Sequence, residues 1–327
     1  MSHMTVSRVL TGSQAVLPET RKRVLEAVSV LNYLPDRTAG AFAARRSGFV
    51  ALIIPVLTNS NFAAFAQGLT ESLRPAGFEL LIGFTSYSIT EEEQQVRTML
   101  ARRPEALVLT GPLQSTGVAD LLSTIPIPIV YIADFVEERQ GWSVGFSNYE
   151  VGCAAARYLL SLGHRRIGAL GSQFTPDLRD CRGDDRLVGF AATLLAAGVP
   201  TDLVLRHGTP PVSFDHGAAA MAVLLERAPD VQAVFAVSDL SAVGAMMECR
   251  RRGVKVPRRI SIIGFGDFDI GRQIVPALTT FAVDFAAMGR QTGALIGALL
   301  KGETPAERTV DVGFSLVRRQ SCAGPDH

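Results

Sequence analysis

The sequence predicts an α/β protein in which two doubly wound lobes accompany a small all-α head. Three observations predict this class. From Gly48 onward, strand-sized apolar runs alternate with longer amphipathic segments, which is the pattern of βαβ units and parallel sheets. The pattern breaks once and then resumes, which indicates two sheets. At 327 residues and 47% apolar content, the chain is long enough to bury two or three separate cores.

The elements of the first lobe follow one another as strand and helix. Strands are expected at 49–56, 78–84, 105–111 and 127–133, with helices at 61–77, 90–103 and 119–125. The second lobe repeats this order. Its strands are expected at 165–171, 203–208, 231–237 and 259–266, with helices at 184–198, 216–228 and 238–253. A helix at 284–302 and a strand at 308–317 are left over, so we expect the chain to cross between the lobes more than once.

Glycines mark the ends of several helical segments. Five of these segments end at a glycine, which closes a helix in the left-handed conformation at no side-chain cost. These residues are Gly77, Gly163, Gly198, Gly253 and Gly302.

Several function classes lack a motif. The four cysteines are far apart and the five histidines have no metal-ligand spacing, so we expect no metal and no cofactor. No apolar run approaches the roughly 18 residues of a membrane span. No signal peptide opens the chain, and we therefore expect a cytoplasmic protein that contacts no membrane.

Open α/β sheets bind ligands at the carboxyl ends of their strands, and two facing lobes form a cleft there. A dinucleotide would need G-x-G-x-x-G after a strand, but the segment at Gly264 and Gly266 has the wrong spacing. No phosphate-binding loop and no G-x-S-x-G elbow are present. The sequence therefore favours a binding protein over an enzyme.

Charge is distributed unevenly along the chain. Residues 1–46 hold seven Arg or Lys residues against three acidic ones, whereas the remainder holds 25 basic and 28 acidic residues. A basic head on a slightly acidic body is typical of nucleic-acid binding, although a solvated helical face explains the same charge.

The order of motifs resembles the LacI/GalR family of bacterial transcriptional repressors. The head carries TVSRVLTG, LPETRKRVLEAVSVLNYLP and DRTAGAFAARRSG, and the body carries SNYEVGCAAARYLLSLGHRRIGALG, DRLVGF, AVFAVSDLSAVGAM and VPRRISIIGF. The resemblance covers almost the whole chain. It implies two lobes like those of periplasmic binding proteins behind a helix-turn-helix head. It also implies a homodimer that binds operator DNA, because half-site symmetry requires one.

The resemblance divides the chain into a head at 1–35, a hinge helix at 36–47 and an effector domain at 48–327. The first lobe is expected at about 48–147 plus 279–306, and the second at about 148–276 plus 308–327. TVSRV matches the recognition helix, so the helix that normally precedes it is missing, and we expect this chain to bind operator DNA weakly or not at all. The DNA contacts implied are Thr5, Ser7 and Arg8 in the head and Arg37, Phe42 and Arg45 in the hinge helix, where Phe42 would enter the minor groove. For Phe42 the alternative is simple packing on the lobe.

The effector is expected to be a sugar acid such as gluconate. Family members for neutral sugars and purines commonly carry an Asp where this chain has Gly266. The absence of a carboxylate at this position of the pocket favours an anionic ligand, because like charges repel strongly at low dielectric. The stretches GFGDFDIGRQIVPALTT and DVGFSLVRRQS also resemble the gluconate-operon repressor branch. A regulator responsive to a neutral sugar or a purine, and a sugar-binding protein without DNA function, remain as alternatives.

The resemblance also implies a set of effector-binding residues. Arg186 would hold the ligand carboxylate, with an ion pair to Asp184 or Asp185 as its alternative role. The other residues implied are Asn61, Phe62, Asp134, Ser238, Asp239, Gly266 and Asp267, of which Ser238 or Asp239 would also cap a helix and Asp134 and Asp267 have turn roles as alternatives.

Overall fold

The computed structural model describes residues 2–10, 15–33, 47–111, 115–135 and 141–325. The chain divides into two units, residues 1–48 and residues 49–327. Within the described residues, no helix is long and apolar enough to cross a membrane.

The small unit is helical. It consists of α1 (His3–Leu10) and α2 (Pro18–Val30). Pro18 occupies the first turn of α2, where its missing N–H costs nothing. The two helices contact each other, and Val9 and Val24 are each 3% exposed, so an apolar contact holds the pair together.

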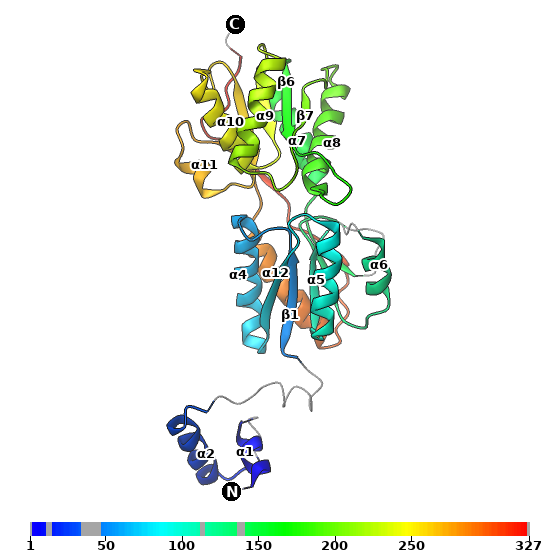
Figure 1. Ribbon diagram of the computed structural model, residues 1–327, viewed down its shortest axis with the longest axis vertical. Coiled ribbons are helices and arrows are strands. Elements are labelled where there is room, and N and C mark those ends of the chain that lie inside the picture. Colours follow the sequence, from blue (N-terminus) through cyan, green and yellow to red (C-terminus); the bar gives the residue numbers. More distant parts are fainter. Residues whose placement is uncertain (1, 11–14, 34–46, 112–114, 136–140, 326–327) are drawn as a thin grey trace. The chain divides into compact units, whose positions relative to one another are not determined.

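The large unit contains two lobes, each built on a six-stranded sheet (Figure 1). The sheet of the first lobe is parallel throughout, in the order β11-β5-β4-β3-β1-β2. Its strands are β1 (Phe49–Ile54), β2 (Glu79–Phe84), β3 (Ala106–Thr110), β4 (Ile129–Ile132), β5 (Trp142–Gly145) and β11 (Thr309–Asp311). Its helices are α4 (Ser60–Leu73), α5 (Ile89–Ala101), α6 (Thr116–Ser123) and α12 (Phe285–Leu300), with a 3₁₀ turn η1 (Arg74–Ala76) after α4.

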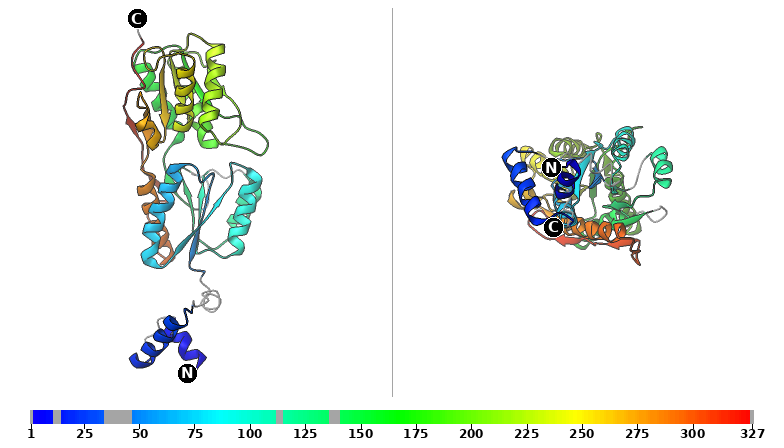
Figure 2. Two further views of the ribbon diagram at one scale, coloured as in Figure 1. Left: turned by 60° about the vertical axis from the view of Figure 1, so that its left-hand side comes forward. Right: turned by 90° about the horizontal axis from the view of Figure 1, so that it is seen from below.

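Helices cover both faces of this sheet, as Figure 2 shows in its left view. Successive side chains of a strand point to opposite faces. Val50, Leu52 and Ile54 of β1 accordingly lie in one core cluster with residues of α4 and α12, whereas Ala51 and Ile53 lie in another with residues of α5 and α6. This explains why β1 reads as an unbroken apolar run.

The second lobe has the strand order β12-β10-β9-β8-β6-β7, and only the β10–β12 pair is antiparallel. Its strands are β6 (Ile167–Gly171), β7 (Val204–Arg206), β8 (Ala233–Ala236), β9 (Ser261–Phe265), β10 (Thr279–Ala282) and β12 (Ser315–Val317). Its helices are α7 (Asn148–Ser161), α8 (Cys181–Ala196), α9 (Phe214–Arg227), α10 (Asp239–Arg251) and α11 (Asp269–Gln273). The predicted fold class is therefore correct.

Pairs of helices cross at glycines. A methyl group on any of these glycines would overlap a backbone carbonyl of the facing helix, so the crossings are closer than other residues allow. The glycines are Gly68 and Gly289 between α4 and α12, Gly152 and Gly189 between α7 and α8, and Gly217 and Gly244 between α9 and α10. The five glycines expected to end helical segments all have positive φ angles, as predicted.

The lobe boundaries differ from those expected. β10 joins the second sheet and β11 the first, so the expected strand at 308–317 is two strands in two lobes. The chain crosses between the lobes after β5, after β10 and after β11. Residues 279–282 therefore belong to the second lobe and residues 309–311 to the first. β5 and β10 have four residues each and were not predicted, because their strand character depends on pairing with distant neighbours.

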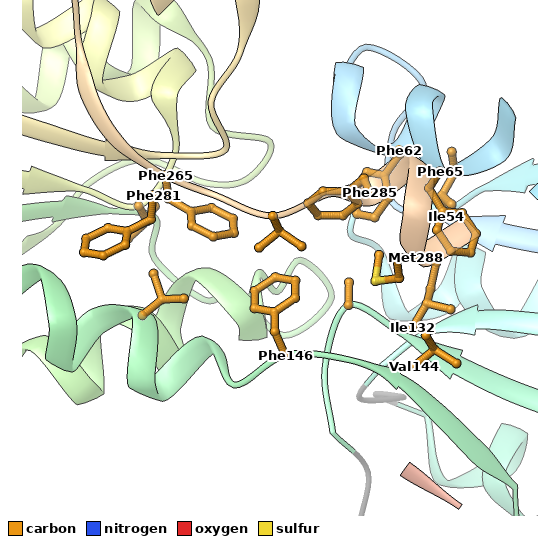
Figure 3. Packing of buried hydrophobic residues seen from close by; sticks show 14 of the residues in the cluster. Ile54, Phe62, Phe65, Ile132, Val144, Phe146, Phe265, Phe281, Phe285 and Met288 are labelled. Carbon is orange, nitrogen blue, oxygen red and sulfur yellow. The ribbon is translucent and has the colours of Figure 1, made fainter. Parts of the chain in front are cut away.

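An aromatic cluster joins the two lobes near these crossings (Figure 3). Phe146 lies 5.7 Å from Phe265 of the second lobe and 6.1 Å from Phe285 of the first, measured between ring centroids. Phe62 lies 6.1 Å from Phe285 with its ring edge-on. All four rings are 7% exposed or less, so one apolar core is continuous from lobe to lobe.

Candidate functional site

A cleft opens between the lobes at the carboxyl ends of their strands. About 640 Å³ between the walls is free of protein atoms, part of it open to solvent. Aromatic side chains form much of the lining, together with a few polar groups that converge from both lobes. This position and composition are typical of a small-molecule site in an open α/β fold.

Three helices have their N-cap residue in the wall of the cleft. Their N-cap residues all line it: Asn59 accepts a hydrogen bond from the Asn61 N–H at 3.0 Å, Asp180 from the Gly183 N–H at 3.0 Å, and Ser238 from the Leu240 N–H at 3.3 Å. Asn59 starts α4, Asp180 starts α8 and Ser238 starts α10. Helix N-termini carry partial positive charge, which favours negative charge on a ligand, whereas the Asp180 carboxylate in the same wall opposes it.

Arg186 lies in the cleft wall and is 7% exposed. Its Nη1 donates to the Oδ1 of Asn148, its guanidinium lies 4.3 Å from the centroid of the Phe265 ring, and its buried Nε has no hydrogen-bond partner among the described residues. Burial lowers the pKa of this guanidinium. Among the described residues, no carboxylate is in direct contact with this buried cation, and Asp180 is the acidic residue with the largest charge interaction.

The alternative role for Arg186, an ion pair with a neighbouring aspartate, does not hold. Asp184 is paired with Arg206. No ion pair joins Asp185 to Arg186 in the described part of the chain, and burial raises the pKa of Asp185. The helix turns Arg186 toward the cleft and the side chain of Asp184 toward β7.

A second arginine of the cleft was not predicted. Arg182 lies one turn before Arg186 on α8, so both side chains share a helix face. Its Nη1 donates to the carbonyl of Gly111 in the first lobe at 2.9 Å, and its guanidinium lies 5.9 Å from the Phe62 ring centroid. The four-residue spacing of the two arginines is a sequence signal that would have identified it.

Besides Arg186, three of the expected residues line the cleft. Asn61 and Phe62 lie in the first turn of α4, and Ser238 lies before α10. Asn61 also joins the lobes, because its Nδ2 donates to the carbonyl of Gly266 at 3.0 Å.

Gly266 differs from its expected role. It does not itself line the cleft, and its φ of +127° favours glycine. A Cβ at this position would lie 2.7 Å from the ring of Phe268 and 3.2 Å from the Asn61 Nδ2. The Phe268 ring lines the cleft here, so an apolar surface stands where a side chain at position 266 would project.

Asp239 and Asp267 do not line the cleft, which corrects their expected role. Asp239 is fully buried and accepts hydrogen bonds from the Thr280 Oγ1 at 2.6 Å and from the Phe268 N–H at 2.9 Å. Burial raises the pKa of its carboxyl to about 7. Asp267 has a φ of +52° and pairs with Arg319 and Arg272. Both carboxylates hold the turn that presents Phe268.

Asp134 is likewise not among the cleft-lining residues. Its Oδ1 accepts a hydrogen bond from the Phe135 N–H at 2.8 Å, which is the turn role considered as its alternative. Burial raises the pKa of its carboxyl to about 6. Asn148, which does line the cleft, contacts the same loop through the carbonyl of Ala133 at 2.9 Å.

Other cleft residues were missed by sequence reasoning. Tyr87 has a φ of +65°, which is rare for a large side chain, and burial raises the pKa of its phenol. Asn148 lies inside a recognised motif without having been singled out. The cleft-lining residues that were not predicted include Tyr87, Phe146, Asn148, Asp180, Arg182, Phe265, Phe268 and Phe285.

The head residues form a separate group. Thr5, Ser7 and Arg8 all lie on α1, where Ser7 and Arg8 are exposed and Thr5 is half-buried. Arg37, Phe42 and Arg45 lie outside the described residues. The described residues contain no group of three or more His, Cys, Asp or Glu side chains that would hold a metal ion.

Comparisons with known proteins agree with this architecture. Residues 1–36 match the family model of bacterial regulatory proteins of the lacI family, and residues 156–322 match that of the periplasmic binding protein-like domain. The HTH-type transcriptional regulator GntR of Pseudomonas aeruginosa is 36% identical over 98% of this chain and 92% of its own length.

Solved structures show the same likeness. A LacI family transcriptional regulator from Silicibacter pomeroyi is 38% identical, with a TM-score of 0.78, and the match covers 84% of this chain and 99% of that one. The transcriptional regulator CelR in complex with cellobiose is 30% identical, with a TM-score of 0.73, and the match covers 98% of this chain and 96% of that one. These proteins are named as transcriptional regulators and not as enzymes.

Proposed function

The chain belongs to the lacI family of bacterial DNA-binding transcriptional regulators, and from this premise we propose that it represses genes of carbohydrate catabolism under the control of a sugar acid such as gluconate. The effector would bind in the cleft between the lobes. No catalytic role is part of this proposal.

The environment of Arg186 carries the argument for an acid. A buried guanidinium is costly unless it is paired, and its only described hydrogen bond is to a neutral amide. A ligand carboxylate at this position would supply the missing charge and would accept two parallel N–H bonds. The second cation, Arg182, and the N-termini of α4, α8 and α10 act in the same direction.

The turn at Gly266 supports the same proposal. The cleft wall at this turn is the ring of Phe268, and the nearby carboxylates of Asp239 and Asp267 are occupied by other partners. The turn therefore directs no carboxylate at the ligand. Repulsion between like charges, which would oppose an acid in a desolvated pocket, is avoided there.

A neutral sugar is the second candidate, because a relative is named in complex with cellobiose. The aromatic rings of the cleft favour the apolar faces of sugars as much as those of aldonates. The discriminating feature is charge. With a neutral ligand, Arg186 would have no carboxylate in direct contact among the described residues, and only the more distant charges of Asp180 and Asp134 would offset its own.

In the head, we place the DNA contacts on α1. Thr5 and Ser7 would donate hydroxyl hydrogen bonds to phosphates and Arg8 would supply a charged contact. Arg37, Phe42 and Arg45 would follow as a hinge segment, with Phe42 inserted in the minor groove. A homodimer would present two such heads to a two-fold symmetric operator. Effector binding would close the lobes and weaken DNA binding, and linkage makes this coupling reciprocal.

A ligand panel tests the effector class. The panel contains gluconate, related aldonates, neutral hexoses, cellobiose and purines, titrated by calorimetry and by thermal unfolding. A ligand at 100 times its dissociation constant stabilises the folded state by about 2.7 kcal/mol. We expect the acids alone to raise the unfolding temperature. Stabilisation by cellobiose or hexoses without stabilisation by acids would replace the sugar acid with a neutral effector and leave the family unchanged.

A further inference from the structure

A loop of the second lobe reaches the first lobe at the start of α5. The backbone carbonyl of Asp177 accepts a hydrogen bond from the Ile89 N–H at 2.9 Å. Its carboxylate Oδ1 accepts from the Thr90 N–H at 2.9 Å and from the Thr90 Oγ1 at 2.8 Å. Asp177 lies between β6 and α8 in the second lobe, so all three bonds join one lobe to the other.

Two of these bonds come from the first N–H groups of α5, and the third comes from the Thr90 hydroxyl. The first turn of a helix leaves its N–H groups without intrahelical partners. Ser88, the N-cap of α5, accepts from the Glu91 N–H at 3.0 Å. Asp177 takes the N–H groups of Ile89 and Thr90, so a residue of one lobe completes the cap of a helix in the other.

Backbone contacts extend this junction. The Arg179 N–H donates to the carbonyl of Tyr87 at 3.0 Å, and Ser88 and Leu178 form an isolated antiparallel bridge. The hydrogen bonds from Ser88 and Thr90 hold the pKa of the Asp177 carboxyl below its usual range, so the carboxylate is ionised at neutral pH. An ionised acceptor gives the stronger kind of hydrogen bond.

The junction lies on the side of the cleft away from the chain crossings. α5 follows β2, which is an edge strand of the first sheet, and the Asp177 loop follows β6, which is next to the edge strand β7 of the second. The crossings involve β5 and β11 in the first sheet and β10 and β12 in the second, toward the opposite edges. Rotation about the crossings therefore separates the junction more than it separates residues near the hinge.

The same segments supply side chains to the cleft. Tyr87 lines it three residues before Thr90, and Asp180 and Arg182 line it shortly after Asp177. The junction thus holds the two ligand-facing segments together without its own carboxylate lining the cleft. Its bonds exist only while the lobes are close.

We propose that Asp177 is a positioning residue for effector binding, which favours the closed arrangement of the lobes by capping α5 across the cleft. The proposal rests on the proposed function for the identity of the effector. When only the closed arrangement binds ligand well, the apparent dissociation constant equals the intrinsic one divided by the closed fraction. Removing the cap lowers that fraction and weakens binding, although no ligand contact is lost.

The test compares Asp177→Ala with Asp177→Asn in the full chain, using gluconate as the probe in calorimetric titration. Alanine removes the side-chain acceptor, and we expect the dissociation constant to rise by roughly threefold to tenfold, the range typical of deleting a helix cap. Asparagine keeps an acceptor oxygen and caps about as well as aspartate. We therefore expect it to restore most of the affinity.

Two further variants keep the result specific. Asp202→Ala removes the same charge from the same lobe, but Asp202 pairs with Arg166 inside the second lobe, and this variant should bind gluconate like the wild type. Thr90→Val removes the hydroxyl partner of Asp177 from the other lobe. Because both residues act through one contact, the effects of Asp177→Ala and Thr90→Val should combine to less than their sum.

A measurement without ligand separates this proposal from the identity of the effector. Small-angle X-ray scattering of the unliganded chain should give a larger radius of gyration for Asp177→Ala than for wild type and Asp202→Ala. If gluconate fails to bind the wild type, the proposed effector is wrong and the scattering comparison still tests the cap. Unchanged scattering in Asp177→Ala, or equal affinities of the alanine and asparagine variants, would overturn the proposal.

Discussion

Replacing Arg186 by methionine should separate effector binding from folding. Methionine is unbranched and apolar, so it fills much of the volume of the arginine stem without its charge. Arg186 is 7% exposed, its guanidinium lies against the ring of Phe265, and its described hydrogen bond is to Asn148. The substitution therefore removes a buried cation that contacts no carboxylate of the described residues.

Two opposing contributions determine the stability of the unliganded variant. Removing a desolvated charge is favourable, because burying a charge without a partner in direct contact costs free energy. The Oδ1 of Asn148 loses its partner, which costs about 1–3 kcal/mol, while its Nδ2 still donates to Ala133. We expect these contributions nearly to cancel, with a change of less than about 2 kcal/mol in the free energy of unfolding.

Effector binding should respond very differently. Hydrogen bonds to charged groups contribute about 1.5–3 kcal/mol each. Loss of a bidentate carboxylate contact should therefore weaken gluconate binding at least about 100-fold, which corresponds to about 2.7 kcal/mol.

Urea unfolding of the unliganded variant and calorimetric titration with gluconate measure the two effects on the same preparation. Gluconate binding within threefold of wild type would refute the role of Arg186. A loss of more than about 4 kcal/mol of stability would show that the guanidinium has structural partners beyond those described.

Two further predictions concern the supports of the cleft. In Gly152→Ala the new methyl group would overlap the carbonyl of Arg186, so α7 and α8 must separate. We expect the free energy of unfolding measured in urea to fall by about 1–3 kcal/mol, and gluconate binding to weaken. The matched change Gly297→Ala, whose methyl group meets no atom within 4 Å, should be tolerated. Asp239→Asn should become more stable relative to wild type as the pH rises from 5 to 8. The folded pKa of Asp239 is raised to about 7, so the folded wild type binds more protons than the unfolded chain and loses stability over this range. Urea unfolding at several pH values measures this. The prediction fails if the stabilities of the two proteins change in parallel with pH.

Much of the fold could be predicted because its signals are local. Apolar runs of strand length, amphipathic segments and closing glycines all lie within a few residues of the elements they specify. The short strands β5 and β10 escaped prediction because their strand character depends on pairing with distant neighbours. The segment 308–317 was predicted as one strand because its apolar pattern is continuous. In the structure, residues 312–314 carry the chain from β11 in the first lobe to β12 in the second.

The candidate site was predictable only in part. Asn61, Phe62 and Ser238 lie where strands meet helix N-termini, and this placement follows from the order of elements; Arg186 lies in the second turn of α8 and was identified from the resemblance. Asp239 could not be assigned in this way, because its partner Thr280 is 41 residues away along the chain. A carboxylate that follows a strand faces either the ligand or the interior, and the nearest available donor decides between them.

The sequence alone determined the repeated βα order, the helical head and the family, since each depends on residue type at short spacing. Only the tertiary structure decided which polar groups meet in the cleft. Asn61 and Gly266 are 205 residues apart and yet form one hydrogen bond between the lobes. Such pairs depend on how two sheets are brought together by three chain crossings. Local sequence patterns do not distinguish among the polar residues that follow the strands. Burial and long-range hydrogen bonds therefore decide which of them face the ligand.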